Sequence, residues 1–421
     1  MKTALVIGAG AREHAIARRL AGEGWAVTCA PGNAGIARSL PCRPVDATDG
    51  AAVVKLAREI GAALVVVGPE APLVAGVADA LCAAGVPAFG PSAAAARVEA
   101  SKIFAKELMD EARIPTASWR AFDRPEEALA HARALHGRVV VKADGLAAGK
   151  GVTVSQELAS AEEAIVAALV RHDLGEAGRR ILLEELLPGR ELSLMAVCDR
   201  TTYRLLPLAQ DYKRAHDGDR GPNTGGMGAV SPPPETVPYA AEQLAELAIA
   251  PMLAALARRG SPFRGVLYAG LMLTSDGPRV LEYNCRLGDP ETQLLVERVE
   301  GELGEAFLAA ATAGLLGITL RERELWAVGV VSAAEGYPQR PRLGDPVSGL
   351  DEAEALPGAH LLYAGLAGDP RRPVTAGGRV LNAVGVGASL AEARERAYRA
   401  SDLVSFRGRQ LRRDIGGGGN R

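Results

Sequence analysis

Glu282 and Asn284 are a pair of side chains that could do chemistry, because they lie two residues apart at the end of a short apolar run. In a strand, residues two apart point to the same face, so both oxygen-bearing groups would face one site. Magnesium suits such ligands, since it takes one or two carboxylates from a protein and fills its shell with phosphates and water. Arg286 begins a polar run, residues 286–293, that would place a guanidinium beside the metal. The alternative is a solvated strand edge without a ligand.

A glycine-rich segment between two apolar runs could hold phosphate, since it contains Lys150 and directly follows Lys142. It differs from a P-loop, because only three residues separate Gly145 from Gly149 and because Gly151 stands where Ser or Thr would bind magnesium. The apolar flanks predict strands, so we expect a hairpin whose backbone N–H groups fold over a triphosphate. The alternative is a plain hairpin turn.

A second glycine motif, Gly8-x-Gly10, follows the first apolar run and precedes a helical segment. Bare backbone at a helix N-terminus can approach a phosphate closely. The dinucleotide-binding fingerprint is incomplete, however, because Glu13 replaces its third glycine and no acidic residue ends the next strand. The motif therefore argues against NAD and leaves two interpretations, a tight turn without a ligand and a nucleotide-binding oxidoreductase.

The elements around these motifs begin with alternating strands and helices over residues 1–100. Such alternation predicts a parallel sheet with crossover helices. Ligands bind parallel sheets at the carboxyl ends of the strands, so the loops at that edge should face one crevice. The expected strands are 3–7, 26–29 and 63–67, the expected helices are 12–23 and 49–60, and the loops are 8–10, 31–33 and 68–70.

The pattern changes at about residue 101, where a helix over 103–111 should end before Pro115. Short strands then predict a small α+β lobe that carries the glycine hairpin, followed by a second, mixed sheet. A segment rich in Gly, Pro and Asp, residues 209–234, is expected to be a long functional loop. The expected strands are 138–142, 151–154 and 181–184 in the lobe and 191–197, 203–207, 266–274 and 279–283 in the sheet. After residue 326 we expect strands and turns and a last helix over 390–403.

The composition limits the classes of partner. Lys plus Arg number 48 and Asp plus Glu number 50, so no global positive field would hold nucleic acid or an acidic membrane. Hydrophobic residues are 48% and charged residues 23%, which is typical of a folded globular protein. The five cysteines are scattered without a C-x-x-C pair, which predicts reduced thiols in the cytoplasm and no structural zinc. We expect neither a signal peptide nor a membrane span.

Six runs of residues together resemble the phosphoribosylamine–glycine ligases, also called glycinamide ribonucleotide synthetases, of the ATP-grasp superfamily. The glycine hairpin alone indicates only the superfamily, whereas the last two runs are specific to this ligase family. The resemblance extends over nearly the whole chain. The matching runs are residues 10–14, 31–35, 67–73, 142–151, 221–228 and 286–293.

The resemblance implies an α/β chain in which an ATP-grasp fold follows a Rossmann-like domain and precedes a small β-rich domain. The implied reaction joins glycine to 5-phosphoribosylamine through glycyl phosphate in purine biosynthesis, with ATP as co-substrate and Mg²⁺ or Mn²⁺ as cofactor. Small molecules would be the only partners of a monomer. The alternative is another ATP-grasp carboxylate–amine ligase. The implied domains are 1–100 (Rossmann-like), 101–120 with 191–325 (central ATP-grasp), 121–190 (lid) and 326–421 (C-terminal).

The resemblance also implies roles for individual residues. One departure is Gly270, which stands where many relatives have a further metal-binding glutamate, so the ligands of a second metal stay open. The implied ATP-binding residues are Lys102, Lys142, Gly145, Gly149, Lys150, Gly151, Glu184, Glu185, Leu187 and Glu191, and the metal ligands are Glu282 and Asn284. The implied substrate-binding residues are Gly10, Asn33, Glu70, Asn223, Thr224, Gly225, Gly226, Met227 and Asp289, and the implied catalytic residues are Asp211, Lys213 and Arg286.

Overall fold

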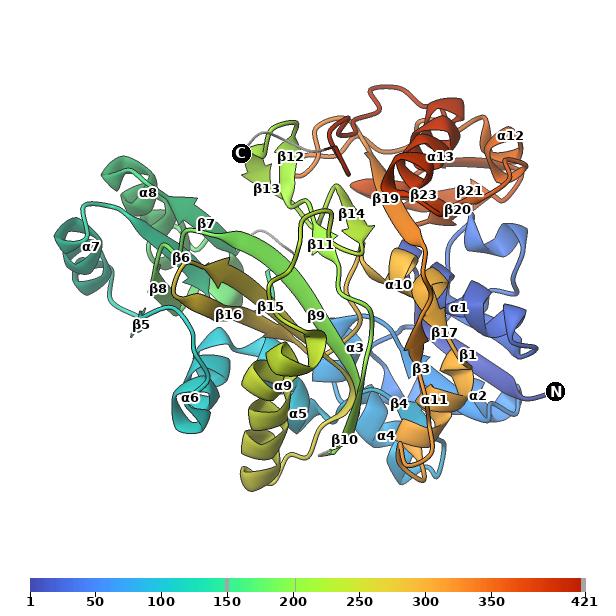
Figure 1. Ribbon diagram of the computed structural model, residues 1–421, viewed down its shortest axis with the longest axis horizontal. Coiled ribbons are helices and arrows are strands. Elements are labelled where there is room, and N and C mark those ends of the chain that lie inside the picture. Colours follow the sequence, from blue (N-terminus) through green and yellow to red (C-terminus); the bar gives the residue numbers. More distant parts are fainter. Residues whose placement is uncertain (148–150, 201, 418–421) are drawn as a thin grey trace.

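A parallel sheet begins the chain in the computed structural model, which describes residues 1–147, 151–200 and 202–417 (Figure 1). Its strands lie in the order β2-β1-β3-β4 with every pair parallel, which confirms the sheet predicted for this region. Strand β3 is buried throughout, as expected for a strand covered on both faces. The elements are β1 (Thr3–Gly8), α1 (Ala11–Gly22), β2 (Ala26–Pro31), α2 (Gly50–Glu59), β3 (Leu64–Val67), α3 (Glu70–Val74), α4 (Val77–Ala83), β4 (Ala88–Phe89) and α5 (Ala93–Ala100).

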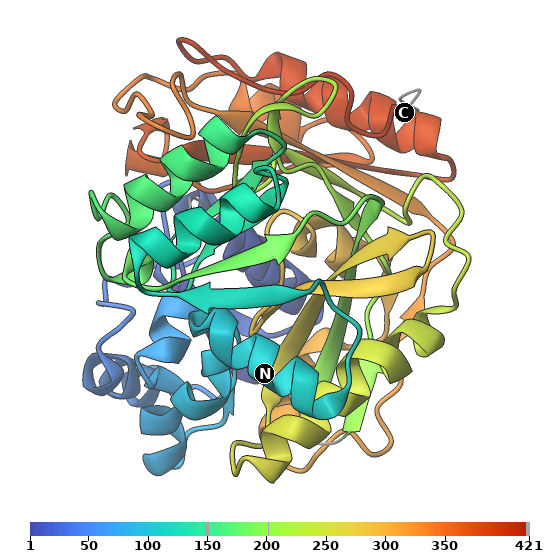
Figure 2. The same ribbon diagram turned by 90° about the vertical axis from the view of Figure 1, so that its left-hand side faces the viewer.

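A small lobe, the lid, lies at the left of Figure 1 and has a sheet of order β5-β8-β6-β7 with antiparallel pairs. Two helices cover one face through a separate core that includes Phe122 and Ile165, and Figure 2 shows them in front of the sheet. Lys142 pairs with Val152, so the strands beside the glycine-rich segment form a hairpin, as predicted. The elements are β5 (Trp119–Phe122), α7 (Pro125–Ala134), β6 (Val139–Ala143), β7 (Val152–Ser155), α8 (Leu158–Leu169) and β8 (Ile181–Glu185).

The central sheet has the order β10-β9-β15-β16. The sequence predicted a mixed sheet, but all three pairings are antiparallel. Leu194 and Leu267 of this sheet pack in the same core cluster as Leu5 and Val65, so the N-terminal and central parts share one core. The elements are α6 (Lys102–Ala112), β9 (Arg190–Asp199), β10 (Thr202–Leu205), α9 (Ala241–Arg258), β15 (Arg264–Thr274), β16 (Gly277–Asn284), α10 (Thr292–Arg298) and α11 (Leu303–Ala311).

Helix α6 positions Lys102 at its first residue. Ser101 caps the helix, because its hydroxyl accepts a hydrogen bond from the Phe104 N–H at 3.1 Å. The helix ends at Arg113, whose φ of 55° is left-handed, just before Ile114-Pro115. The predicted stop before Pro115 is therefore confirmed.

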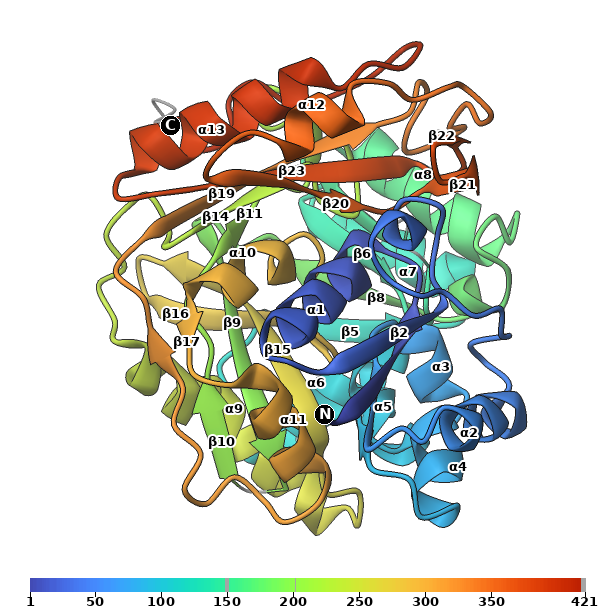
Figure 3. The same ribbon diagram turned by 90° about the vertical axis from the view of Figure 1, so that its right-hand side faces the viewer.

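The C-terminal sheet has the order β11-β14-β19-β23-β20, with α13 packed on one face. Figure 3 shows this sheet beside helix α1, where the Tyr363 N–H donates to His14. No helix in the described ranges combines the length and the apolarity that crossing a membrane requires. The elements are β11 (Gln210–Asp211), β12 (Arg214–His216), β13 (Arg220–Asn223), β14 (Gly228–Ser231), β17 (Val299–Glu300), β18 (Arg321–Glu322), β19 (Trp326–Ala333), α12 (Leu350–Glu354), β20 (Ala359–Tyr363), β21 (Leu366–Asp369), β22 (Arg372–Thr375), β23 (Arg379–Gly387) and α13 (Leu390–Leu403).

The long loop predicted over residues 209–234 is wrong, because this segment contains strands β11 to β14. Residues 228–231 are all buried and pair with residues 327–330 of β19, about a hundred positions later in the chain. That pairing is invisible to local composition, in which Gly and Pro dominate. Two strands that precede residue 325 thus belong to the C-terminal sheet.

Candidate active site

A cavity of about 680 Å³ lies where the lid, the N-terminal part, the central sheet and the C-terminal sheet meet. Its volume suits a nucleotide with a small substrate. Its lining brings together most of the residues that the sequence singled out. Those residues are Glu70, Lys102, Lys142, Gly145, Gly151, Glu184, Glu185, Leu187, Glu191, Asp211, Lys213, Asn223, Thr224, Gly225, Glu282, Asn284, Arg286 and Asp289.

Two lysines share one carboxylate at the lid end of the cavity, although only Lys142 lines the cavity itself. Lys142 Nζ donates to Glu184 Oε2 at 2.9 Å and to the Leu281 carbonyl at 3.0 Å. Lys106, which sequence reasoning missed, contacts the same oxygen at 3.1 Å and is 1% exposed. The other carboxylate oxygen of Glu184, Oε1, is buried without a hydrogen-bond partner among the described residues.

Glu282 and Asn284 end strand β16, and both line the cavity, as the alternation predicted. Burial alone would raise the pKa of Glu282, but the charges of Lys102, Lys142 and Lys213 lower it to about 2. Lys102 Nζ lies 3.9 Å from the Glu282 carboxylate. Gly270 lies opposite Glu282 in the register, so no second acidic side chain faces it there.

These two residues fit a magnesium ion. An ionised carboxylate and an amide oxygen supply hard ligands, and such an ion takes its remaining ligands from phosphates and water. Within the described ranges, no group of three or more His, Cys, Asp or Glu side chains could hold a metal, so a cage made of protein alone is not present there. The arrangement therefore favours an ion shared with a phosphate-bearing substrate.

Arg286 lies between two carboxylates. Its Nη2 contacts Glu99 at 2.8 Å and its Nε contacts Glu70 at 3.2 Å. Burial would raise the pKa of Glu70, but Arg286 and Arg12 lower it to about 2. Glu99 was missed because it belongs to no recognisable motif, and only the fold brings it to the cavity. Arg12 lies in the matching run of residues 10–14 but was given no role of its own.

Asp211 and Lys213 face the cavity from the start of the segment that was expected to be a loop. Lys213 forms ion pairs with Glu191 and with Asp211, the latter at 3.5 Å. Burial and the charges of Glu291 and Glu191 raise the pKa of Asp211, although Lys213 opposes the shift. Lys213 keeps its proton firmly, because Asp211 and Glu191 raise its pKa against the effect of burial.

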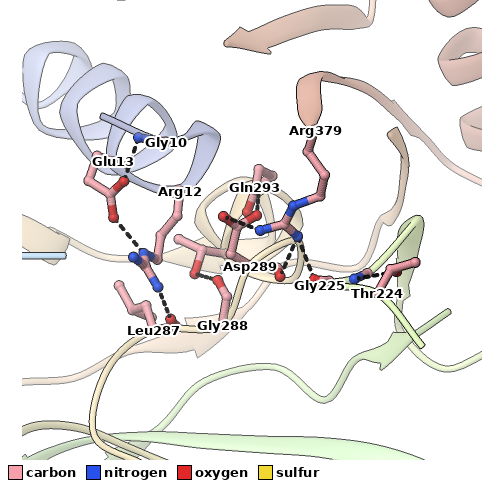
Figure 4. A network of polar contacts seen from close by, with 12 residues as sticks. Gly10, Arg12, Glu13, Thr224, Gly225, Leu287, Gly288, Asp289, Gln293 and Arg379 are labelled. Atoms are coloured by element: carbon pink, nitrogen blue, oxygen red, sulfur yellow. Dashed lines mark hydrogen bonds and ion pairs between the residues drawn. The ribbon is translucent and has the colours of Figure 1, made fainter. Parts of the chain in front are cut away.

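The C-terminal sheet contributes Arg379 to the cavity, as Figure 4 shows. Its Nη1 donates to the carbonyl of Gly225 and, at 2.8 Å, to that of Asp289, and its Nη2 lies 2.9 Å from the Asp289 carboxylate. The Gly225 N–H donates to the Tyr337 hydroxyl at 2.9 Å. Arg379 and Tyr337 were missed, because in the sequence they stand in a region of turns without a binding motif.

Four of the expected substrate residues do not line the cavity: Gly10, Asn33, Gly226 and Met227. The Asn33 side chain joins backbone segments by hydrogen bonds. Its amide group donates to the carbonyls of Ala9 and Tyr363, and its oxygen accepts from two backbone N–H groups. Gly149 and Lys150 lie outside the described residues.

The N-terminus of helix α1 is filled by the protein itself. The Glu13 carboxylate accepts from the Gly10 N–H at 2.7 Å and pairs with Arg12 (Figure 4). A Cβ on Gly8 would lie 2.4 Å from the Glu13 side chain. A buried carboxylate therefore stands where a dinucleotide phosphate would have to bind, which disfavours the oxidoreductase interpretation.

Comparisons with known proteins cover nearly the whole chain. Three family profiles match in succession: Phosphoribosylglycinamide synthetase, N domain, over residues 2–99; its ATP-grasp (A) domain over 100–292; and its C domain over 327–418. The phosphoribosylamine–glycine ligase of Streptomyces coelicolor is 50% identical over 416 residues, 98% of both chains.

Solved structures are similar to this chain as well. The crystal structure of phosphoribosylamine–glycine ligase from Thermotoga maritima is 34% identical, with a TM-score of 0.85 over 98% of this chain and 100% of that chain. A biotin carboxylase domain from Hydrogenobacter thermophilus, in complex with MgADP and bicarbonate, shares the fold with a TM-score of 0.71 at 16% identity over 97% and 91% of the two chains.

Proposed function

Because the chain belongs to the phosphoribosylglycinamide synthetase family, we propose that its cavity is the place where ATP, glycine and phosphoribosylamine react. The chain is an ATP-dependent phosphoribosylamine–glycine ligase of purine biosynthesis. This activity takes the place of both alternatives, another ATP-grasp carboxylate–amine ligase and a nucleotide-binding oxidoreductase.

The reaction needs no protein nucleophile. The glycine carboxylate attacks the γ-phosphorus of ATP, ADP leaves, and glycyl phosphate forms. The amine of phosphoribosylamine then attacks the acyl carbon, loses a proton and displaces phosphate. Both steps develop charge on oxygen atoms, so cations and N–H donors stabilise their transition states. Lys102, Lys142 and Arg286 line the cavity and supply such groups.

The nucleotide base belongs at the lid end. Glu184 Oε1 is a buried acceptor without a donor, a situation that costs about 1–3 kcal/mol. The exocyclic amine of adenine would satisfy it, whereas the oxygen that guanine carries at that position would be repelled. Glu185 and Leu187 line the same wall, where their backbone would read the base edge, and Glu191 would reach the ribose. Gly145 and Gly151, which line the cavity, would then lie over the phosphates.

Glu282 and Asn284 would hold the divalent ion, Mg²⁺ or Mn²⁺. When bound, the ion neutralises charge on the transferring phosphoryl group. Lys102 and Lys142 hold the adjacent phosphate oxygens, and Lys102 already lies 3.9 Å from the Glu282 carboxylate. The lysines and the two metal ligands facing one cavity are the observation that carries the proposal.

The sugar substrate belongs on the C-terminal side. Glu70, Asn223, Thr224, Gly225 and Asp289 line this part and would contact ribose and phosphate. The family's other positions there, Gly10, Asn33, Gly226 and Met227, lie behind that lining and would hold its shape. Arg286 would bind the glycine carboxylate as it becomes phosphorylated, and Asp211 and Lys213 would orient an amine or a phosphate group of the substrates.

The test is ADP release with each substrate omitted in turn. Phosphoribosylamine is generated in the assay from ribose 5-phosphate and ammonia. We expect ADP and glycinamide ribonucleotide to form in equal amounts only when glycine and phosphoribosylamine are both present. ATP turnover that continues without glycine would contradict the proposal.

We also propose a monomeric, cytoplasmic enzyme. The five cysteines are free, as a reducing compartment would keep them. Light scattering should give a mass near 43.7 kDa, and a mass twice as large would contradict the monomer.

A further inference from the structure

One wall of the cavity carries more negative charge than the protein itself balances. Three carboxylates, those of Asp211, Glu191 and Glu291, face this part, and Lys213 forms ion pairs with only the first two. In the described part of the chain, no Lys, Arg or His nitrogen lies within ion-pair distance of Glu291.

Two hydroxyl groups position the Glu291 carboxylate by donating hydrogen bonds to it. Glu291 is 2% exposed, and its Oε1 accepts from the Tyr268 hydroxyl at 2.6 Å and from the Ser193 hydroxyl at 3.0 Å. Its Oε2 has no hydrogen bond to any described residue. Gly288 packs behind this oxygen, since a Cβ there would lie 2.5 Å from it. Oε2 is not among the fully enclosed side-chain atoms, so a donor on a ligand in the cavity can reach it.

Gln210 is a second, independent indication of a ligand on this wall. Its side chain lines the cavity and is 6% exposed, and its Oε1 is buried without a hydrogen-bond partner in the described ranges. Gln210, Asp211 and Glu291 all line the same cavity, and the Glu291 charge raises the pKa of Asp211, as expected for neighbouring carboxylates. A cation with several N–H donors fits this set of acceptors, whereas an anion or a neutral acceptor does not.

We propose that Glu291, together with Gln210 and Asp211, binds the α-ammonium group of glycine. The inference rests on the proposed function, because among its substrates only glycine carries a fixed cation: ATP is anionic, and the amine of phosphoribosylamine must be neutral to attack. An ammonium group supplies three N–H donors to three acceptors. Holding it protonated also prevents a bound glycine from acting as the nucleophile.

The main test is Glu291→Gln, which keeps the size of the side chain and an oxygen for Tyr268 and Ser193 but removes the charge. We expect the KM for glycine to rise at least 30-fold while the KM for ATP changes less than 3-fold. Glu300→Gln removes an exposed carboxylate outside the cavity and serves as the matched control with wild-type constants. An unchanged KM for glycine would overturn the inference.

A second readout separates charge recognition from damage to the fold. Glycolate carries a hydroxyl in place of the ammonium, so its inhibition constant should change little in Glu291→Gln, and its ratio to the KM for glycine should fall at least tenfold. If Glu291→Gln weakens the binding of glycine and of glycolate equally, Glu291 has a structural role, and the inference would be overturned. If Glu291→Gln does not fold, Gln210→Met provides the same comparison.

Failure of the proposed function and failure of the ammonium site give different results. If the unmodified enzyme releases no ADP with glycine and phosphoribosylamine, the proposed function fails. If it does release ADP but Glu291→Gln retains the discrimination between glycine and glycolate, only the ammonium site fails.

Discussion

At the scale of single residues, the shared carboxylate of Glu184 couples two lysines. Burial lowers the pKa of Lys106 to about 8, although Glu184 opposes the shift. Above that pH Lys106 is neutral, so Glu184 binds Lys142 more strongly and draws it away from phosphate. The KM for ATP should therefore rise as the pH passes through 8.

Lys106→Met should already have a KM for ATP about 5-fold higher at pH 7, because the second cation is absent at every pH. Its KM should lack the rise near pH 8. Steady-state kinetics between pH 6.5 and 9.5 checks both statements, with the exposed Lys55→Met as the control. Identical profiles for Lys106→Met and the unmodified enzyme would show that Lys106 does not act on the nucleotide.

Glu282→Gln tests the proposed ion directly. The amide keeps the shape of the side chain but loses the charge that attracts a divalent cation. We expect the magnesium concentration for half-maximal activity to rise at least tenfold, about 1.4 kcal/mol. Calorimetric titration of the enzyme with MgATP provides a second measurement. Equal magnesium dependence in both proteins would exclude Glu282 as a ligand.

The sequence was sufficient for residues whose neighbours in the chain are also their neighbours in space. Glu282 and Asn284 face one cavity because strands alternate, and that periodicity is local. Glu99 could not be found in this way, and Glu291 stood inside the polar run of residues 286–293 without a role of its own. Their functions depend on Tyr268, Ser193 and Arg286, which reach them only through the fold.

At the scale of elements, the start of strand β23 ties two distant loops together. Arg379 binds carbonyl groups of Gly225 and Asp289, which lie more than sixty positions apart in the chain. A planar guanidinium can hold these carbonyls and the Asp289 carboxylate at once, whereas an ammonium group cannot reproduce that geometry.

Arg379→Lys should lower kcat/KM for phosphoribosylamine about tenfold or more and leave the KM for ATP unchanged, because the loops beside the sugar lose their common anchor. Arg372→Lys, which changes an exposed arginine at the start of strand β22, is the matched control. A similar rise in the KM for ATP would indicate that the whole cavity has lost its shape. It would contradict a role of Arg379 that is confined to the sugar site.

Strands β11 to β14 show where prediction of elements fails. Helices α1, α2, α6 and α13 and most strands follow from periodicity, caps and prolines near their own residues, as Ser101 and Pro115 do for α6. The short strands of residues 210–231 are instead defined by pairing with β19 and by the β12–β13 hairpin, and their Gly and Pro content hides them.

At the scale of the whole molecule, the N-terminal and C-terminal parts are joined by a buried histidine. His14 of α1 is 3% exposed, its ring stacks on Tyr363 with centroids 5.3 Å apart, and its Nδ1 accepts from the Tyr363 N–H at 3.0 Å. Burial, assisted by the charges of Arg18 and His360, lowers the pKa of His14 to about 3. Protonation of Nδ1 would break the bond between the two parts.

Acid should therefore separate these parts. The unfolded chain binds a proton at His14 below about pH 6.5, but the folded chain does so only near pH 3. The contribution of His14 to the free energy of unfolding is therefore fully present above pH 6.5 and falls as the pH decreases from 6.5 to 3. This single group contributes a slope of about 1.4 kcal/mol per pH unit. His14→Asn keeps an acceptor for the Tyr363 N–H but does not titrate, so its urea midpoint should fall less steeply with acid. The exposed His172→Asn should keep the original slope, and an equally steep fall for His14→Asn would assign the acid sensitivity to other groups.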